Sequence, residues 1–180
     1  MASLHTLVLS TSLNPDSKSR VLSEKIFDAL GKVMEPEDTS AFVDLREFPL
    51  PLCDGDTAYG AKNVSEMARE IGRADCIIVG FPVYNFTCSA ALKNLIELTG
   101  RAWENKIVGF VCAAGGKSSY MSVMSIANSL MLDFRCLIVP RFVYSDPEAF
   151  AEMTHADSSV ERRLHELAGT TVRLARSLSS

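Results

Sequence analysis

Long hydrophobic runs are missing from this sequence. No apolar stretch approaches the roughly 20 residues that a helix needs to cross a bilayer. The opening residues, MASLHTLVLSTS, carry no basic segment ahead of their short apolar run, as a signal peptide would. We therefore expect no membrane partner, and the cytoplasm is the expected location.

The chain also has little excess of charge of either sign. Its formal net charge is −4, which is too small to favour nucleic acid or an anionic membrane surface as a partner. Its 47% apolar and 22% charged residues are ordinary for a globular protein. A length of 180 residues suits one hydrophobic core, so we expect residues 1–180 to form a single domain.

The cysteines lack the spacing of a metal site or of a disulfide framework. The chain has five, an odd number, and none of them forms a CxxC pair, so neither zinc nor a set of disulfides is expected. Cys76, Cys112 and Cys136 lie in strand-like runs, where a free cysteine packs as a small apolar residue. No His–Asp or Cys–His arrangement stands out either, and we predict no catalytic side chain.

What the sequence does contain is a regular alternation of strands and helices. Five short apolar segments are typical of buried strands: Thr6–Ser10, Ala41–Leu45, Ile77–Val79, Lys106–Ala113 and Cys136–Val139. Helical spacing of apolar residues follows each strand: from about Ser19, over Val64–Ile71, from Ser89, over about Ser119–Leu132 and over about Ser158–Leu178. The alternation predicts an α/β fold, a three-layer sandwich with helices on both faces of a five-stranded parallel sheet of order 2-1-3-4-5.

In such a sheet, ligands bind beyond the carboxyl ends of the strands, where the strand order reverses. For this order the reversal lies between the first and third strands. The loops after the first, third and fourth strands would meet there. Their sequences are TSLNPDSKS, PVYNF and AAGGKSS, and they are the most distinctive loops in the chain.

The first of these loops is rich in hydroxyl groups and precedes a helix. Backbone N–H groups and the positive end of the dipole at a helix N-terminus suit a phosphate. The alternative is helix capping by Ser17 or Ser19, but capping needs only one hydroxyl. The loop matches neither a Walker motif nor GxGxxG, so ATP and a Rossmann-bound dinucleotide are disfavoured. The candidate phosphate-binding residues are Ser10, Ser12, Asn14, Ser17, Ser19 and Arg20.

The other two loops suit a flat ligand. We expect the third strand to break at Gly80 and Pro82, leaving Tyr84 and Asn85 in a loop that contacts the face and edge of a heteroaromatic ring. The alternative is a turn with a core aromatic residue. In the last loop, Gly115-Gly116 would let the backbone approach a ligand closely, although an ordinary strand-to-helix turn is the alternative.

The hydroxyl-rich loop, the segment GFPVYNFTCSAALKNLIE and the CAAGG segment resemble those of the NADPH-dependent FMN reductase family. The resemblance implies a flavodoxin-like fold, FMN as cofactor, and NADPH or NADH as hydride donor to flavin N5. A small molecule such as a free flavin, a quinone, an azo compound or a metal oxyanion would then accept the electrons. It places the FMN phosphate on the first loop, and the ribityl chain and ring against Pro82, Val83, Tyr84, Asn85, Phe86, Ala114, Gly115, Gly116 and Ser118.

Two other functions remain as alternatives. One is a non-enzymatic electron carrier like flavodoxin, although such carriers are more acidic and have a TxTGxT phosphate loop. The other is a binding or scaffold protein with a degenerate flavin site. The resemblance also implies a homodimer or homotetramer. The helix over about Ser119–Leu132 agrees with this because its apolar residues point in nearly all directions.

One cysteine lies where it could take part in the chemistry. Cys88 precedes a helix, whose dipole can lower a thiol pKa, and it is four residues beyond Tyr84. No His or Lys lies nearby in the sequence to activate it, so we expect a packing role.

Overall fold

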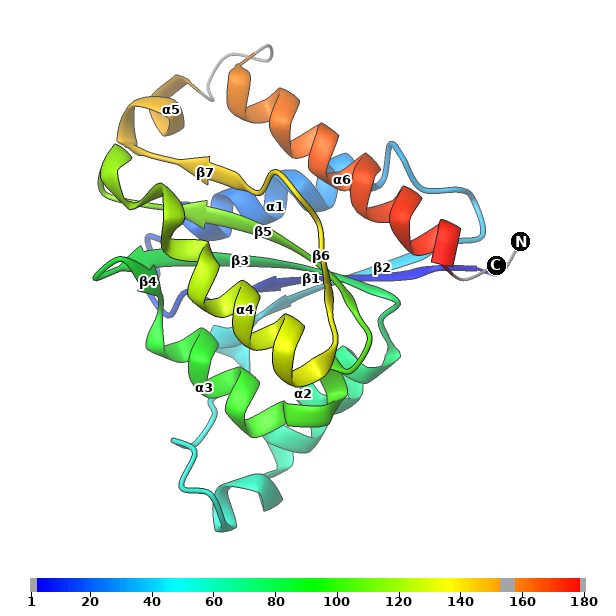
Figure 1. Cartoon of the computed structure of the whole chain (residues 1–180), viewed down its shortest axis with the longest axis vertical. Coiled ribbons are helices and arrows are strands. Elements are labelled where there is room, and N and C mark those ends of the chain that lie inside the picture. The colour runs from blue at the N-terminus through cyan, green and yellow to red at the C-terminus, as the bar shows by residue number, and fades with distance from the viewer. Residues whose placement is uncertain (1–2, 153–157, 179–180) are drawn as a thin grey trace.

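A twisted parallel sheet runs through the middle of the molecule, in a computed structural model that describes residues 3–152 and 158–178 (Figure 1). The predicted strand order is confirmed, because the strands follow one another as β2-β1-β3-β5-β6. Two further strands bring the sheet to seven within the described residues. The bounds are β1 (His5–Ser10), β2 (Thr39–Asp44), β3 (Cys76–Tyr84), β4 (Thr87–Cys88), β5 (Ile107–Ala113), β6 (Leu137–Ile138) and β7 (Val143–Ser145).

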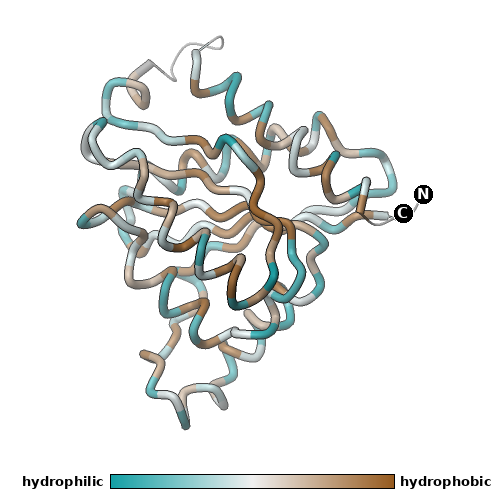
Figure 2. Tube along the Cα trace, viewed as in Figure 1, coloured by the Kyte–Doolittle hydropathy of each residue, from teal (hydrophilic) through white to brown (hydrophobic). Residues whose placement is uncertain are grey.

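Helices cover both faces of this sheet, as predicted. Helices α1 and α6 pack on one face, and α2, α3 and α4 pack on the other (Figure 1). Hydrophobic segments concentrate along the strands between these layers (Figure 2). The bounds are α1 (Lys18–Leu30), α2 (Lys62–Arg73), α3 (Ala90–Thr99), α4 (Val123–Phe134), α5 (Pro147–Glu152) and α6 (Ser159–Leu178), with 3₁₀ turns η1 (Leu45–Glu47), η2 (Thr57–Gly60), η3 (Gly100–Trp103) and η4 (Lys117–Ser122).

The predicted end of the third strand is wrong. Gly80 and Pro82 do not break β3, which continues to Tyr84. Alternate residues of a strand point their backbone groups to the same side. The carbonyl of Gly80 accepts a hydrogen bond from the backbone N–H of Thr11, so the backbone groups of Gly80 face β1. Pro82 is two residues further along and faces the same side, but β1 ends opposite Gly80. No ladder hydrogen bond is lost there, and the proline is tolerated.

The predicted fifth strand, Cys136–Val139, is shorter in the structure, where β6 pairs with the start of β5. Strand β7, which was not predicted, pairs with the end of β5, so the edge of the sheet is interrupted. Pro140 and Arg141 lie in the interruption, and Arg141 has a φ of 62°. A proline without a donor and a residue in the left-handed region cannot continue a ladder. The short helix α5, which follows β7, was not predicted.

The helix predicted to start at about Ser119 begins later. Residues 117–122 form η4, and α4 starts at Val123. Helix α4 buries Val123 and Ile126 among other residues, while Met124 and Met131 remain exposed. Among the described residues, no helix is both long and apolar enough to cross a membrane.

Candidate functional site

The loops after β1, β3 and β5 meet at the carboxyl edge of the sheet (Figure 1). Thr11 joins the first loop to β3, since its backbone N–H and its hydroxyl both donate to the carbonyl of Gly80, at 2.9 and 3.0 Å. At the other side, the N–H of Ala114 donates to the carbonyl of Ser145 at 2.9 Å. Strand pairing therefore brings together the segments that the sequence indicates for the site.

The first loop gathers buried hydroxyl groups at the N-terminus of α1. Ser10, Ser12, Ser17 and Ser19 are all at least nine-tenths buried. The hydroxyl oxygen of Ser17 accepts from the N–H of Arg20 at 3.1 Å and lies 3.0 Å from that of Ser19. Helix capping thus explains the hydroxyl of Ser17, but it does not explain those of Ser10, Ser12 and Ser19. The hydroxyl of Ser10 has no hydrogen-bond partner within the described part of the chain. A buried hydroxyl without a partner is costly, so this group is available to hydrogen-bond a ligand.

Asn14 and Arg20 are less available than the serines. The side-chain oxygen of Asn14 accepts from the N–H of Asp16 at 3.0 Å, which fixes the turn. The guanidinium of Arg20 contacts two carboxylates, with Nε 2.8 Å from Asp44 Oδ2 and Nη1 2.7 Å from Glu24 Oε1. Arg20 therefore lies beside the loop with much of its charge already neutralised.

The sequence did not indicate a second arginine at this loop. Arg46 follows β2 in η1, and its Nη2 lies 2.6 Å from the buried carboxylate of Asp44, while Nη1 donates to the carbonyl of Pro15 at 3.4 Å. Burial alone would raise the pKa of Asp44, but hydrogen bonds from Arg46 and Arg20 hold that pKa below its usual value. An ionised Asp44 thus fixes both arginines against the first loop. A signal was present, since β2 neighbours β1 in the predicted order and places its last residues beside this loop.

The second loop is shorter than predicted and is the turn of a hairpin. Tyr84 pairs with Thr87, and the two residues between them, Asn85 and Phe86, have φ values of 49° and 66°. Positive φ at both central positions is the requirement of a type I′ hairpin turn. Tyr84 and Phe86 are 52% and 55% exposed, so the alternative of a core aromatic residue is wrong for both. Two aromatic rings are therefore presented to solvent beside the carboxyl edge of the sheet, with Val83 half-buried and Pro82 buried behind them.

The third loop leaves its backbone open. A Cβ atom placed on Gly115 or Gly116 would meet no described atom within 4 Å, so packing does not require glycine at either position. Tyr144 of β7 donates its hydroxyl to the carbonyl of Gly116, which anchors the loop. Ala114 is half-buried and Ser118 is exposed. The loop can therefore approach a ligand without a steric barrier.

Two cavities border these loops. One, of about 530 Å³, lies between the hairpin and the neighbouring helices α3 and α4, and Tyr84, Cys88 and Ser125 are among its lining residues. The other, of about 440 Å³, is lined by Leu13 of the first loop and by Arg46, among others. Both volumes lie in the range of small-molecule sites, roughly 300–1,000 Å³.

The structure favours the packing role of Cys88. Its side chain is 8% exposed and belongs to the main core, in β4 opposite Val83. Burial raises the pKa of the Cys88 thiol, although a hydrogen bond with Thr87 partly offsets this. A thiol that stays protonated at neutral pH is a poor nucleophile.

Comparison with known proteins identifies the family of this chain. The family model for NADPH-dependent FMN reductase matches residues 4–151, which is most of the chain. The chain belongs to the NADPH-dependent FMN reductase family. The enzymatic function is therefore supported over the electron carrier, with FMN as cofactor and NAD(P)H as the hydride donor.

Individual relatives agree with this assignment. An NAD(P)H-dependent FAD/FMN reductase from Geobacillus thermodenitrificans is 27% identical over 168 residues, which cover 91% of this chain and 90% of the relative. An NADPH:quinone oxidoreductase from Arabidopsis thaliana is 27% identical over 175 residues, covering 91% and 88%. An FMN-dependent NADH-azoreductase from Bacillus anthracis, solved in complex with FMN, shares the fold with a TM-score of 0.66 at 13% identity, over 95% of this chain and 99% of that one.

The donors at the first loop fit the phosphate end of this cofactor. A phosphate is an acceptor, and the loop offers hydroxyls as donors together with the unpaired N–H groups of the first turn of α1. The hydroxyl of Ser10 is buried and lacks a partner within the described residues, as expected for a group that completes its hydrogen bonding with a ligand.

Proposed function

We propose that this protein is an NAD(P)H-dependent FMN oxidoreductase that reduces a small-molecule acceptor, with FMN held across the carboxyl edge of the sheet. The observation that carries the proposal is the convergence of three loops at the strand-order reversal, one of them lined with buried hydroxyls. We assign this function to residues 1–180 as a single cytoplasmic domain.

The FMN phosphate would occupy the N-terminus of α1. Ser12, Ser17 and Ser19 would donate their hydroxyls, Ser10 would contribute from the end of β1, and the helix dipole would favour the negative charge. Arg20 and Arg46 would lie at the side of the loop. Because Asp44 holds both guanidiniums and Glu24 also contacts Arg20, much of their positive field is cancelled, and the hydroxyls and the helix N-terminus would make the main contribution to phosphate binding.

The ring of the cofactor would lie between the hairpin and the third loop. Pro82, Val83 and Tyr84 form the end of β3, and Asn85 and Phe86 form the turn. On the opposite side, the main chain of Ala114, Gly115 and Gly116, with Ser118, would face the ring edge, where N–H groups can hydrogen-bond its polar atoms.

The chain's own contribution to catalysis is orientation and access. Bound FMN would supply the hydride and electron transfer to the acceptor, so the side chains would orient the reactants and no protein acid or base would be required. The exposed rings of Tyr84 and Phe86 leave one face of the site open, which suits a second flat molecule stacking there. Acceptors would therefore be planar and small, such as a quinone, an azo compound or a free flavin.

A spectrum of the purified protein tests this function directly. We expect flavin absorbance after reconstitution with FMN, and bleaching when NADPH or NADH is added without air. Subsequent addition of a benzoquinone should restore the oxidised spectrum. A flavin that is bound but not bleached by either nicotinamide would contradict the enzymatic proposal and favour the carrier.

We also propose that the protein forms a homodimer or homotetramer through α4. Three apolar side chains of this helix are exposed, Met124 and Met131 at 42% and 38% and Leu132 at 85%. A second copy packed there would cover them and would close the cavity beside the hairpin. Light scattering at micromolar concentration should show no 19.7 kDa species, and a clean monomer would refute the assembly.

A further inference from the structure

A third cavity, of about 470 Å³, lies at the edge of the sheet between α6, η4 and the residues that connect β6 to β7. The irregular pairing of the edge strand creates it. Val108 pairs with Ile138, and Val111 pairs with Val143. Between these two pairs, β5 has two residues (109–110) and the edge segment has four (139–142). Such a bulge bends the chain away from the ladder, and bulges are frequent next to active sites.

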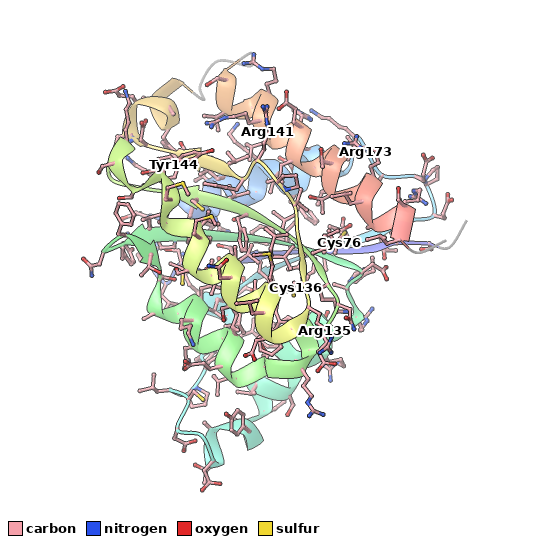
Figure 3. All side chains as sticks on the ribbon, viewed as in Figure 1. Cys76, Arg135, Cys136, Arg141, Tyr144 and Arg173 are labelled. Atoms are coloured by element: carbon pink, nitrogen blue, oxygen red, sulfur yellow. The ribbon has the colours of Figure 1, made fainter. Side chains whose placement is uncertain are left out.

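Helix α6 cannot close this gap because it is held against β5. A Cβ atom added to Gly109 would lie 3.2 Å from Leu167 Cδ1, which is already tight for a side-chain contact. The helix thus packs on β5 at Gly109. Of the four bulged residues, Val139 is buried in the core that includes α6, whereas the other three line the cavity. Figure 3 shows Arg141 in this bulge, on the segment that leads to Tyr144.

The walls of the cavity carry two arginines, one carboxylate (Glu166) and two aromatic rings. Arg141 and Arg163 both line it. Arg163 donates from Nη2 to the carbonyl of Tyr144 at 2.9 Å, whereas its buried Nε has no partner within the described residues. The ring centroid of Tyr120 lies 4.8 Å from that of Phe142, and the Tyr120 side chain is 46% exposed. The site therefore offers guanidinium donors next to a partly exposed aromatic ring.

The cavity adjoins the loop that we assign to the flavin ring. Tyr120 belongs to η4, which directly follows Gly115-Gly116, and the hydroxyl of Tyr144 donates to the carbonyl of Gly116. The cavity and the proposed ring site therefore share this loop and η4 as neighbouring segments. One end of an extended substrate could lie there while its other end reaches the flavin.

We propose that this cavity binds the adenosine 2′-phosphate end of NADPH, an inference that rests on the proposed function. Arg141 and Arg163 bind the phosphate, because a guanidinium fork matches phosphate oxygens. The ring of Tyr120 stacks on the adenine. Glu166 and Thr170, which also line the cavity, accept and donate hydrogen bonds at the ribose. The enzyme accordingly prefers NADPH to NADH.

Calorimetry with nucleotide fragments tests the site without the flavin. The probes are adenosine 2′,5′-bisphosphate and 5′-AMP, and the wild type should bind the bisphosphate at least tenfold more tightly. Arg141→Asn should remove this difference. Asparagine is chosen because it tolerates the positive φ at this position. Arg162→Asn is the matched control, since Arg162 neighbours Arg163 on α6 but is exposed outside the cavity lining.

Steady-state kinetics give a second readout. The ratio of kcat/KM for NADPH to that for NADH should fall at least tenfold in Arg141→Asn and stay within twofold of wild type in Arg162→Asn. Equal binding of the two fragments by the wild type, or an unchanged ratio in Arg141→Asn, would overturn the inference. If the protein binds the bisphosphate but neither NADPH nor NADH bleaches its bound FMN, the proposed function is refuted, whereas the nucleotide site is not.

Discussion

Gly80 connects the stability of the fold with the geometry of the phosphate site. It lies in β3 under α1, where an added Cβ atom would be 1.8 Å from Ser23 Oγ, 3.2 Å from Ser23 Cβ and 3.4 Å from the carbonyl oxygen of Ser19. Ser23 is fully buried and donates its hydroxyl to that carbonyl at 2.8 Å. Alanine at position 80 therefore cannot be accommodated without a change in α1.

We expect Gly80→Ala to destabilise the protein by about 2–4 kcal/mol. Rotating the Ser23 hydroxyl away would lose a buried hydrogen bond, which costs about 1–3 kcal/mol when a partner is left unpaired. The remaining contact with Ser23 Cβ would force a shift of α1, and overpacking of this kind costs about 1–3 kcal/mol. Because we propose that Ser17 and Ser19 at the start of α1 bind the cofactor phosphate, the affinity for FMN should fall as well.

Urea denaturation of the apoprotein measures the first effect, and FMN titration measures the second. Gly169→Ala is the matched control: it lies in α6, where an added Cβ atom meets no described atom within 4 Å. That variant should be more stable by about 0.5–1 kcal/mol because alanine favours a helix. The double variant Gly80→Ala/Ser23→Ala should lose less stability than the two single variants lose together, because the 1.8 Å contact with Ser23 Oγ is removed. Wild-type stability in Gly80→Ala alone would refute this account of the packing.

Three further predictions concern the site itself. Changing Ser17 and Ser19 together to Ala should weaken FMN binding more than tenfold, because hydrogen bonds to a charged group contribute about 1.5–3 kcal/mol each; unchanged affinity by fluorescence titration would place the phosphate elsewhere. Cys88→Ala should keep most NAD(P)H-dependent turnover with flavin still bound after gel filtration, and a hundredfold fall with full flavin occupancy would show that the thiol takes part. The folded-state pKa of Asp44 is lowered, so its stabilising contribution is complete above the unfolded value of 3.8 and is lost as the pH falls through the folded value. Denaturation measured from pH 6 to pH 2 should therefore show a smaller acid-induced loss of stability in Asp44→Asn, and equal slopes would exclude this role.

Much of the fold could be read from local pattern. The apolar runs at β1 and β5 and the helical spacing of α6 are set by side-chain burial, which repeats along the chain with the period of the element. The alternation of strands and helices predicted a parallel sheet, and 2-1-3-4-5 is one of the common strand orders of such sheets. The site loops followed in turn, since the carboxyl ends of parallel strands meet at one edge.

What the local pattern could not give was any feature that depends on a neighbour in space. Pro82 is read as a break because the sequence does not show that β1 ends opposite Gly80 and leaves its missing N–H without a required partner. Arg46 carries no motif, and only the pairing of β2 with β1 places it against the first loop. The burial of Cys88 likewise depends on the hairpin that folds it against Val83.

The sequence by itself determined the class of fold, the family and the segments that we assign to the site, because each of these depends on residue type and on spacing along the chain. Tertiary structure decided how those segments are used. It converted a predicted loop into a hairpin with two exposed rings, neutralised Arg20 with Asp44, and opened a cavity where the edge strand is bulged. These outcomes depend on distances between residues far apart in the chain, and such distances are fixed only when the helices pack on the sheet.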